Sequence, residues 1–465
     1  MERLTAQDLM SLWPDELGWP MDIGALAILD GTGLLDPDGR FRIEDAREAV
    51  RRRLHLVPRF RQLLYKPPLG LGGPLWVDAP SVDLTEHIRV RQLTAPADEA
   101  QLLLAVERLR ARRLRRSRPL WEMWFLAGLP DGRIGMYLKA HHTIADGVAG
   151  VALLGTLLDV EATVPPTPER PRSPAPMPTK GELLRDILRR RTRAVRGALT
   201  RVAHPVGTAR RARAAWPAIR SFYQARAPRT SLNRPIGADR RLALIRCRLD
   251  LARRVAHAHD AKVNDVLLTV VAGGLRDLLR SRGEPVDVVL RAFVPVSLHR
   301  ERLGAAQGNQ DAVMVAPLPI GEPDVVARLR RIAKATAERK SQIHAPGLNA
   351  FPNSLVQRAA WHMVARQRFV NVTITNVPGP TTPLYFAGAP LLEVFPVVPI
   401  TGNLTLGIGA LSYAGQFNIT AVADRDACPD VEVFAEGLRE SLRALTGAPH
   451  RGRRLVHWPI HADHP

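Results

Sequence analysis

The clearest hydrophobic pattern in the chain is a strict alternation that ends at two adjacent histidines. Every second residue from 134 to 142 falls on one face of an extended segment, because successive side chains of a strand point to opposite faces. His142 continues the apolar face, whereas His141 falls on the other face. The pattern predicts a strand that ends at this pair, with the ring of His142 pointing into the protein. The apolar positions before it are Ile134, Met136, Leu138 and Ala140.

The apolar period changes to a helical one directly after the histidines. Val148, Val151 and Gly155 recur at helical spacing, so Asp146 and Gly147 are predicted at a strand-to-helix junction. A neutral imidazole titrates near working pH, and an inward histidine at such a junction is suited to proton transfer. The alternative is a hydrogen-bonded core histidine with no chemical role.

The rest of the pattern predicts a mixed α/β (α+β) chain with two halves of similar size. We divide it into residues 1–163 with the histidine motif, a linker at 164–235, and residues 236–465. Predicted strands are 23–29, 242–250, 286–296, 313–317 and 369–375, with hairpin tips at 130–132 and 413–415 and a turn at 376–380. Predicted helices are 43–54, 98–114 and 264–280, the last capped by Asn264.

The predicted linker combines proline and arginine. Residues 164–178 hold seven prolines, a density that forbids regular helix. Residues 181–230 hold 13 arginines and two acidic residues, with apolar residues on one helical face as far as about His204. This basic amphipathic helix has three explanations: a solvated face, nucleic-acid binding, or docking on anionic lipid. No nucleic-acid recognition motif accompanies it, which argues against nucleic acid, and a basic amphipathic helix is suited to an anionic lipid surface.

Composition narrows the class further. The chain has 465 residues, 46% of them hydrophobic, and a formal net charge of +21, as expected of a basic globular protein. Its two cysteines, Cys247 and Cys428, lack disulfide or zinc-ligand spacing. Neither a signal peptide nor an apolar run of membrane-spanning length is recognisable. The expected location is the cytoplasm, including the inner membrane surface or lipid droplets as a peripheral site.

Several short motifs occur together in one order. HHTIADG matches the pattern HHxxxDG, and the chain also contains PLW ending at Trp121, the pair Asn264–Asp265, VPVS at 294–297 and NVPGP at 376–380. In these motifs the chain resembles the bacterial wax ester synthase/diacylglycerol acyltransferases over nearly its whole length outside the linker. Trp121 itself is expected in the core rather than against substrate.

That resemblance implies two chloramphenicol-acetyltransferase-like domains with the active site at their interface. It implies transfer of a long-chain acyl group from acyl-CoA, a co-substrate rather than a bound cofactor, to diacylglycerol or a long-chain alcohol. The expected partners are these substrates and an anionic membrane or lipid droplet, with no nucleic acid. The alternatives are another alcohol or condensation-type acyltransferase using the same histidine, and a non-catalytic lipid- or nucleic-acid-binding protein on this scaffold.

The resemblance also suggests residue roles. His142 is the expected general base, which removes the proton of the acceptor hydroxyl and returns it to the departing CoA thiolate, with no covalent acyl-enzyme. His141 supports it, while Asp146 and Gly147 shape the turn, Asp146 pairing with an arginine for which Arg291 is the candidate. A metal site at this motif is disfavoured, because adjacent histidines of a strand diverge.

The Asn264–Asp265 pair has two interpretations. The residue pattern alone makes Asn264 a helix N-cap. The resemblance implies that Asn264 and Asp265 help to organise the active site. The residues that bind CoA and stabilise the oxyanion are not identifiable from the sequence.

Overall fold

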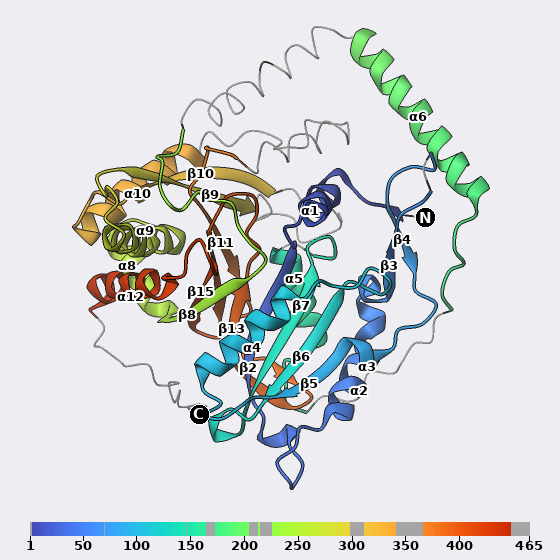
Figure 1. The fold of residues 1–465 in the computed structure, drawn as a ribbon, viewed down its shortest axis with the longest axis horizontal. Coiled ribbons are helices and arrows are strands. Elements are labelled where there is room, and N and C mark those ends of the chain that lie inside the picture. Colours follow the sequence, from blue (N-terminus) through green and yellow to red (C-terminus); the bar gives the residue numbers. More distant parts are fainter. Residues whose placement is uncertain are drawn as a thin grey trace.

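A computed structural model describes residues 2–68, 70–145, 147–163, 173–203, 213, 226–297, 311–340 and 366–447. Two six-stranded sheets, each with its own helices, lie side by side (Figure 1). A third, three-stranded sheet of order β1-β4-β3 joins the N-terminus to the first half. Its strands are β1 (Glu2–Arg3), β4 (Leu75–Asp78) and β3 (Gln62–Tyr65).

The first large sheet has the order β12-β13-β2-β7-β6-β5. Its strands are β12 (Tyr385–Phe386), β13 (Ala389–Val397), β2 (Asp22–Asp30), β7 (Arg133–His141), β6 (Trp121–Ala127) and β5 (Ile88–Gln92). The helices of this half are α1 (Ala6–Glu16), α2 (Ile43–Arg53), α3 (Leu84–His87), α4 (Glu99–Ala111) and α5 (Gly147–Leu157). The strand predicted at 23–29, the hairpin of β6 and β7, and the helices predicted at 43–54 and 98–114 are confirmed.

Both faces of β7 are buried, because each is covered by its own layer. Met136 and Leu138 pack in the cluster that α2 and α5 share. Tyr137, on the opposite face, packs with Leu102 of α4. The alternation correctly predicted two faces, but the polar-looking face is interior as well.

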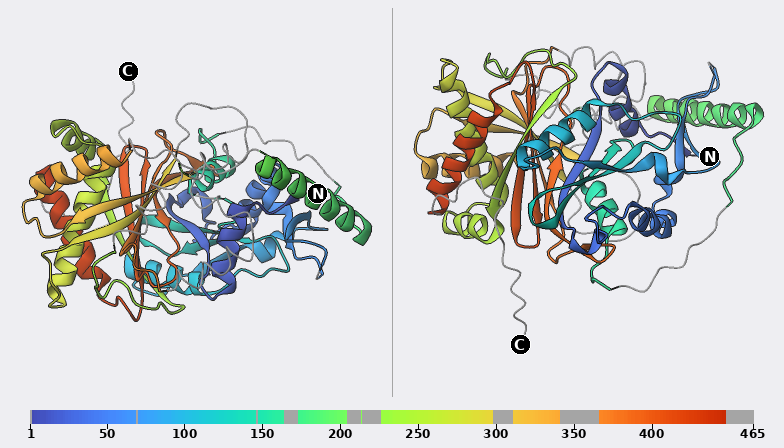
Figure 2. Two further views of the ribbon diagram at one scale, coloured as in Figure 1. Left: turned by 90° about the horizontal axis from the view of Figure 1, so that it is seen from above. Right: turned by 60° about the horizontal axis from the view of Figure 1, so that its bottom comes forward.

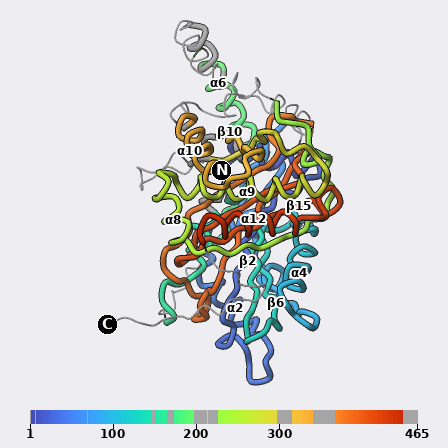
Figure 3. The backbone as a smooth tube through the Cα atoms, turned by 90° about the vertical axis from the view of Figure 1, so that its left-hand side faces the viewer, coloured from blue at the N-terminus to red at the C-terminus, as the bar shows by residue number. Residues whose placement is uncertain are grey.

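The second large sheet has the order β10-β9-β11-β14-β15-β8. Its strands are β10 (Asp311–Pro319), β9 (Val289–Ser297), β11 (Val372–Pro378), β14 (Leu406–Tyr413), β15 (Gln416–Asp424) and β8 (Arg240–Arg248). The helices α8 (Leu249–Ala258), α9 (Val263–Ser281), α10 (Val325–Lys340) and α12 (Val431–Thr446) share its largest hydrophobic core and form a layer on one side of it (Figure 3). The hairpin with a tip at 413–415 is confirmed, with positive φ at Ala414 and Gly415.

Two local predictions in this half are wrong. Strand β11 continues through Pro378, since Asn376 pairs with Ala410 and Pro378 with Ser412 of the parallel strand β14. The predicted turn at 376–380 is therefore strand in its first three residues. Asn264 is not the N-cap of α9, because that helix begins at Val263 and its cap is Lys262.

The two sheets do not divide the chain at a single point. Strand β13 follows the predicted linker in sequence, yet it pairs antiparallel with β2 in the first sheet, Phe395 opposite Leu26. Residues 385–397 therefore complete the first sheet from the second half. The division of the chain into two domains, 1–163 and 236–465, with a linker at 164–235 stays a prediction.

The predicted basic amphipathic helix is present as α6 (Lys180–Ala203). It extends away from the two large sheets (Figure 2). Its first turns attach to the small sheet, since Leu183 is buried against Leu75 and Val77, and Asp186 Oδ2 lies 2.5 Å from Nε of Arg3. No helix in the described parts of the chain is long and apolar enough to cross a bilayer.

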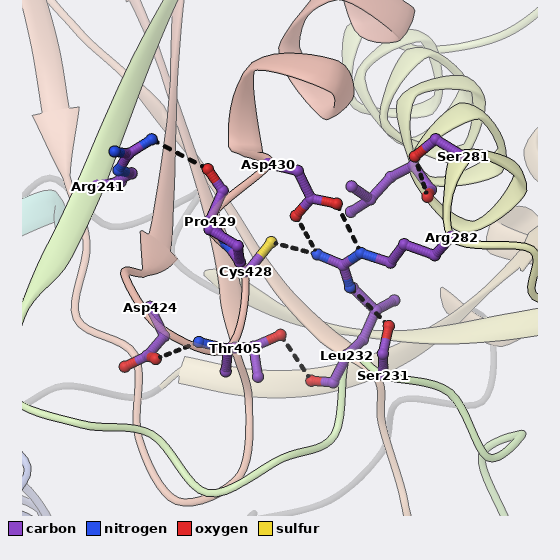
Figure 4. Close-up of polar contacts among 12 residues, drawn as sticks. Ser231, Leu232, Arg241, Ser281, Arg282, Thr405, Asp424, Cys428, Pro429 and Asp430 are labelled. Atoms are coloured by element: carbon purple, nitrogen blue, oxygen red, sulfur yellow. Dashed lines mark hydrogen bonds and ion pairs between the residues drawn. The ribbon is translucent and has the colours of Figure 1, made fainter.

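Arg282 fastens the end of α9 to the start of α12 and to the chain that follows the linker. It donates from Nε to Asp430 (2.8 Å), from Nη1 to the hydroxyl of Ser231 (2.6 Å) and from Nη2 to the sulfur of Cys428 (3.1 Å) (Figure 4). Burial raises the pKa of the Cys428 thiol to about 11, so this cysteine is a neutral part of the core. Cys247, the other cysteine, is also a free thiol.

Candidate active site

The histidine pair lies where β7 leaves the sheet. His141 is the last residue of β7 and sits opposite Asp22 at the start of β2. The backbone N–H of His142 donates to the carbonyl of Met21 (2.8 Å), and Ile144 N–H returns to His141 (2.8 Å). The strand therefore ends at His141, and His142 begins a tight turn. The apolar alternation predicted that the strand would also include His142.

His141 is the more buried of the two rings. It is 3% exposed, and its Nδ1 accepts the backbone N–H of Thr143 (3.2 Å) and lies 2.8 Å from the Thr143 hydroxyl. Burial lowers its pKa, an effect that the carboxylate of Asp22 opposes. Because Nδ1 is an acceptor, the neutral ring carries its proton on Nε2. Nε2 has no hydrogen-bond partner among the residues that the structure describes.

The ring of His142 is half-buried, and that of His141 is buried. The prediction that His142 is the inward-pointing ring of the two is therefore wrong. The alternation placed His142 inside and His141 on the outer face. The strand ends at His141, however, and its ring is enclosed among groups that include Asp15 of α1 and Asp22 of β2, while His142 sits in the turn. A partly exposed imidazole with a fixed backbone is accessible to a substrate.

Helix α1 covers this turn (Figure 1). The hydroxyl of Ser11, on a buried face of α1, lies 3.5 Å from Nδ1 of His142. The helix is held by a capping box between Thr5 and Asp8 and by the ion pair of Asp15 with Arg116 (2.6 Å). The sequence pattern did not identify Ser11, since nothing in the residues of α1 indicates proximity to position 142.

A buried ion pair lies in the sheet next to the histidines. Nζ of Lys139 is 3.1 Å from Oδ2 of Asp22, and it also donates to the carbonyls of Leu109 (3.4 Å), Arg110 (3.3 Å) and Arg112 at the end of α4. The cation therefore forms an ion pair with a buried carboxylate, although Oδ2 of Asp22 has no hydrogen-bond partner among the described residues, and it binds the negative end of a helix. Sequence reasoning placed Lys139 on the outer face and missed this pair.

Trp121 lies in the core, as predicted. Its ring is stacked between Phe60 (centroids 4.3 Å apart) and His87 (4.4 Å). Its Nε1–H donates to the carbonyl of Phe60 (3.0 Å), while its own carbonyl lies 2.8 Å from Nδ1 of His87. Trp121 opposes Ala140 in the β6–β7 pair. The stack of these three rings therefore supports β7, the strand that carries the histidines.

Asp265 makes its contacts inside the helical layer of the second half. Its carboxylate accepts the backbone N–H of Lys262 (2.9 Å) and the hydroxyl of Thr336 on α10 (2.7 Å). Asp265 thus caps α9 from its third position and ties it to α10, which is why Asn264 is not needed as the cap. Asn264 is half-buried in the first turn of α9. The site-organising role predicted for the two residues stays a prediction.

Part of the predicted motif lies outside the described residues. Asp146 is among these, so neither its pairing with Arg291 nor a metal site that includes it is described. Gly147 begins α5. Arg291 donates from Nε to the carbonyl of Phe369 (2.8 Å). No group of three metal-ligating side chains occurs within the part of the chain that the structure describes.

Two family models match most of the chain. The wax ester synthase/diacylglycerol acyltransferase catalytic domain matches residues 4–267, and the WS/DGAT C-terminal domain matches residues 307–446. The chain belongs to the WS/DGAT family. It is 32% identical, over 92% of each chain, to the "probable diacyglycerol O-acyltransferase tgs1" of Mycobacterium tuberculosis. The family suggested by the motifs is thus confirmed.

Solved structures agree with this assignment. The wax ester synthase/diacylglycerol acyltransferase from Marinobacter aquaeolei is 26% identical, with a TM-score of 0.68 over 95% of this chain and 98% of that chain. A starter condensation domain of rhizomide synthetase in complex with C8-CoA is 18% identical with a TM-score of 0.58, covering 96% of this chain and 94% of that one. The second likeness concerns the fold alone. The predicted α/β two-domain class and the prediction of an acyltransferase are confirmed.

Proposed function

We propose that this WS/DGAT protein transfers a long-chain acyl group from acyl-CoA to the hydroxyl of diacylglycerol, with His142 as the general base. The observation that carries the proposal is the half-buried His142 ring in the turn after β7, where the backbone N–H of His142 donates to the Met21 carbonyl. An imidazole in that position is partly exposed, and a neutral imidazole can accept a proton from a hydroxyl. Its neighbour His141 is enclosed and bonded to Thr143. His142 is therefore the histidine suited to meet a substrate.

The proposed reaction needs one base and no covalent intermediate. Nε2 of His142 takes the proton of the acceptor hydroxyl while the oxygen attacks the thioester carbonyl carbon. The carbon–sulfur bond then breaks, and the proton passes from Nε2 to the CoA thiolate, leaving an ester and free CoA. His141, neutral beside it, adds no positive charge that would oppose proton uptake by His142.

The acceptor is inferred from relatives. The mycobacterial relatives are named diacyglycerol O-acyltransferases, and the family name includes wax ester synthesis, which uses a long-chain alcohol. Acyl-CoA is proposed as the donor, and a fold relative was solved with C8-CoA. Release of free thiol from palmitoyl-CoA, with diacylglycerol and hexadecanol offered separately, identifies the acceptor. Equal release with either acceptor and with buffer would support a non-catalytic lipid-binding protein instead.

The base is tested with His142→Ala. We expect thiol release and ester formation to fall at least about 100-fold, because general-base catalysis contributes roughly that much. The matched control is His257→Ala, since His257 is exposed on α8, away from the site, and that variant should keep full activity. Unchanged ester synthesis in a folded His142→Ala protein would overturn the assignment.

We further propose that α6 docks on an anionic membrane or lipid-droplet surface. Leu184, Leu188 and Val195 are 49%, 53% and 57% exposed. Because an α-helix turns by about 100° per residue, these three positions lie within about 40° of one another around the helix. The helix sequence also contains seven arginines, among them Arg191 and Arg185 on either side of the apolar stripe. Apolar residues flanked by cations are typical of helices that lie in a lipid interface.

The attachment of α6 leaves this stripe available. Leu183 and Asp186 hold the other side of the helix to the small sheet. Serine substitutions at Leu184, Leu188 and Val195 should abolish flotation of the full chain with phosphatidylserine vesicles. The matched control replaces Leu56, Val90 and Val433, which are exposed apolar residues elsewhere, and should float normally. Equal flotation of both variants would contradict docking through α6.

A further inference from the structure

We propose that Ser11 is a positioning residue for His142, its hydroxyl accepting a hydrogen bond from Nδ1–H so that the lone pair of Nε2 faces the substrate. The inference rests on the proposed role of His142 as base. It starts from the Ser11 hydroxyl, which lies 3.5 Å from Nδ1 of His142 and joins helix α1 to the turn after β7. A hydrogen bond to one ring nitrogen decides which nitrogen carries the proton.

The hydroxyl is held in place by the packing of α1. Ser11 is 8% exposed, and the neighbouring Leu12 is buried with Trp76 and Leu120. One turn later, Asp15 is bound by Arg116. Because positions 11 and 15 share a helix face, the side of α1 that carries both residues faces the histidine pair. The hydroxyl therefore approaches His142 from a fixed direction.

The backbone of His142 is also fixed. The His142 backbone N–H is bound by the Met21 carbonyl, so the ring can reorient only through its own side-chain torsions. A contact of 3.5 Å is long for a hydrogen bond, but catalytic contacts in ligand-free sites commonly tighten when substrate binds. The Ser11 hydroxyl can rotate about its own side-chain torsion to follow that movement without displacing the helix.

The contact has a chemical consequence over the whole proton cycle. In the neutral ring, Nδ1–H donates to the Ser11 oxygen, so the lone pair that takes the substrate proton is on Nε2. After proton uptake the same Nδ1–H belongs to a cation, and hydrogen bonds from charged donors are about twice as strong. Ser11 therefore stabilises the protonated base more than the neutral base. Its removal should slow the step that protonates His142.

Several charged groups surround the pair and enter any pH dependence. Asp15 comes from α1, Asp22 from β2, and Arg116 from the loop before β6; all three act on His141. Lys139, on β7, neutralises Asp22. Substituting Ser11 changes none of these charges. A shift in the titration of His142 after that substitution would therefore report the lost hydroxyl.

Long-range proton–nitrogen NMR of the full chain labelled with ¹⁵N-histidine tests the contact without relying on activity. The His142 signal is assigned by its loss in His142→Ala. We expect the wild type to show the Nδ1–H tautomer, Ser11→Ala to lose that preference and titrate at lower pH, and Ser11→Thr to behave like the wild type. An unchanged tautomer and titration in Ser11→Ala would overturn the proposal.

Kinetics separate this proposal from the proposed function. Ser11→Ala should lower kcat about 10-fold with KM changed less than about twofold, and Ser11→Thr should restore kcat. The matched control Ser281→Ala removes a helical hydroxyl that binds Leu278 in the second half, and kcat should not change. If the NMR signature shifts in Ser11→Ala while His142→Ala keeps its activity, the contact stands and the general-base proposal fails. A kcat loss without the NMR shift would make Ser11 merely structural.

Discussion

Nζ of Lys139 lies 3.1 Å from Oδ2 of Asp22, and both side chains are buried in the sheet directly before the histidine pair. Lys139 also binds three carbonyls at the end of α4, so one cation links β7, β2 and α4. Removing one member of a buried ion pair leaves the other charge uncompensated, which costs far more than the net contribution of the pair. The geometry of the turn at His142 thus depends on a charge that never reaches solvent.

Lys139→Met should therefore lower the free energy of unfolding by about 3–5 kcal/mol, because Asp22 and the helix carbonyls lose their partner. The double variant with Asp22→Asn should recover part of that loss. Urea denaturation monitored by circular dichroism measures both. Lys66→Met is the matched control, since Lys66 pairs with Glu16 at the surface and such pairs contribute less than about 1 kcal/mol. Equal losses at Lys66 and Lys139 would contradict this account.

The same residues show what the sequence could predict and where it failed. Alternation over 134–140 identified β7 and its two faces, because the period of a strand is a local property. It could not show that α4 covers the second face, since that depends on packing between residues far apart. Lys139 therefore looked solvent-facing, and the alternation was carried one residue too far, to His142. Ser11 was missed for the same reason.

Long-range pairing explains the other differences. Strand β13 was not predicted, and its pairing with β2 joins segments more than 350 residues apart. Asn264 has the side chain of a good N-cap, but Asp265 binds the Lys262 N–H instead and moves the helix start. The motifs fared better than the elements, because HHxxxDG, PLW and NVPGP together identified the family without any knowledge of packing.

A pH dependence of stability is expected from His87. Burial beneath Trp121 lowers its pKa below the ordinary value near 6.5, so the folded protein holds the ring neutral while the unfolded chain takes up a proton. The unfolded state thus binds more protons between the two pKa values. Stability should fall as pH drops from about 7 through that window, by at most about 1.4 kcal/mol per pH unit for this group.

His87→Gln should weaken that dependence. A glutamine amide can still donate to the Trp121 carbonyl but does not titrate, so its unfolding free energy should change less between pH 7 and pH 5 than that of the wild type. Urea denaturation at several pH values measures the difference. The exposed His257→Gln serves as the control and should follow the wild type. Parallel curves for wild type and His87→Gln would show that His87 does not titrate in this way.

Arg282 should be a strong determinant of the stability of the second half. Its guanidinium donates hydrogen bonds to Asp430, Ser231 and Cys428 where the end of α9 meets the start of α12 (Figure 4). Its guanidinium holds the pKa of Asp430 below the usual range, so the pair contributes stability that is lost as pH falls through that lowered value. Arg282→Met should cost about 2–3 kcal/mol near neutral pH.

The Arg282 prediction has a direct chemical readout. Loss of the anchor should also speed labelling of the buried Cys428 by a maleimide, measured by mass spectrometry of the modified peptide. Arg280→Met, in the last turn of α9 where its ion pair with Asp277 is exposed, is the control and should label at the wild-type rate. Labelling of Cys428 at the same rate in both variants would show that Arg282 does not hold this region closed.

Trp121 should act through stability and not through substrate binding. Its ring is fully buried between Phe60 and His87, so no part of it faces a substrate, although it belongs to the PLW motif. Trp121→Phe keeps an aromatic ring in the stack but removes the Nε1–H bond to the Phe60 carbonyl, which should cost about 1–3 kcal/mol. At a temperature where the variant is folded, KM for acyl-CoA and for the acceptor should stay within about twofold. A raised KM with unchanged stability would place Trp121 against substrate instead. Trp124→Phe, on the same strand with its Nε1–H bound to Glu122 near the surface, is the matched control and should lose less stability.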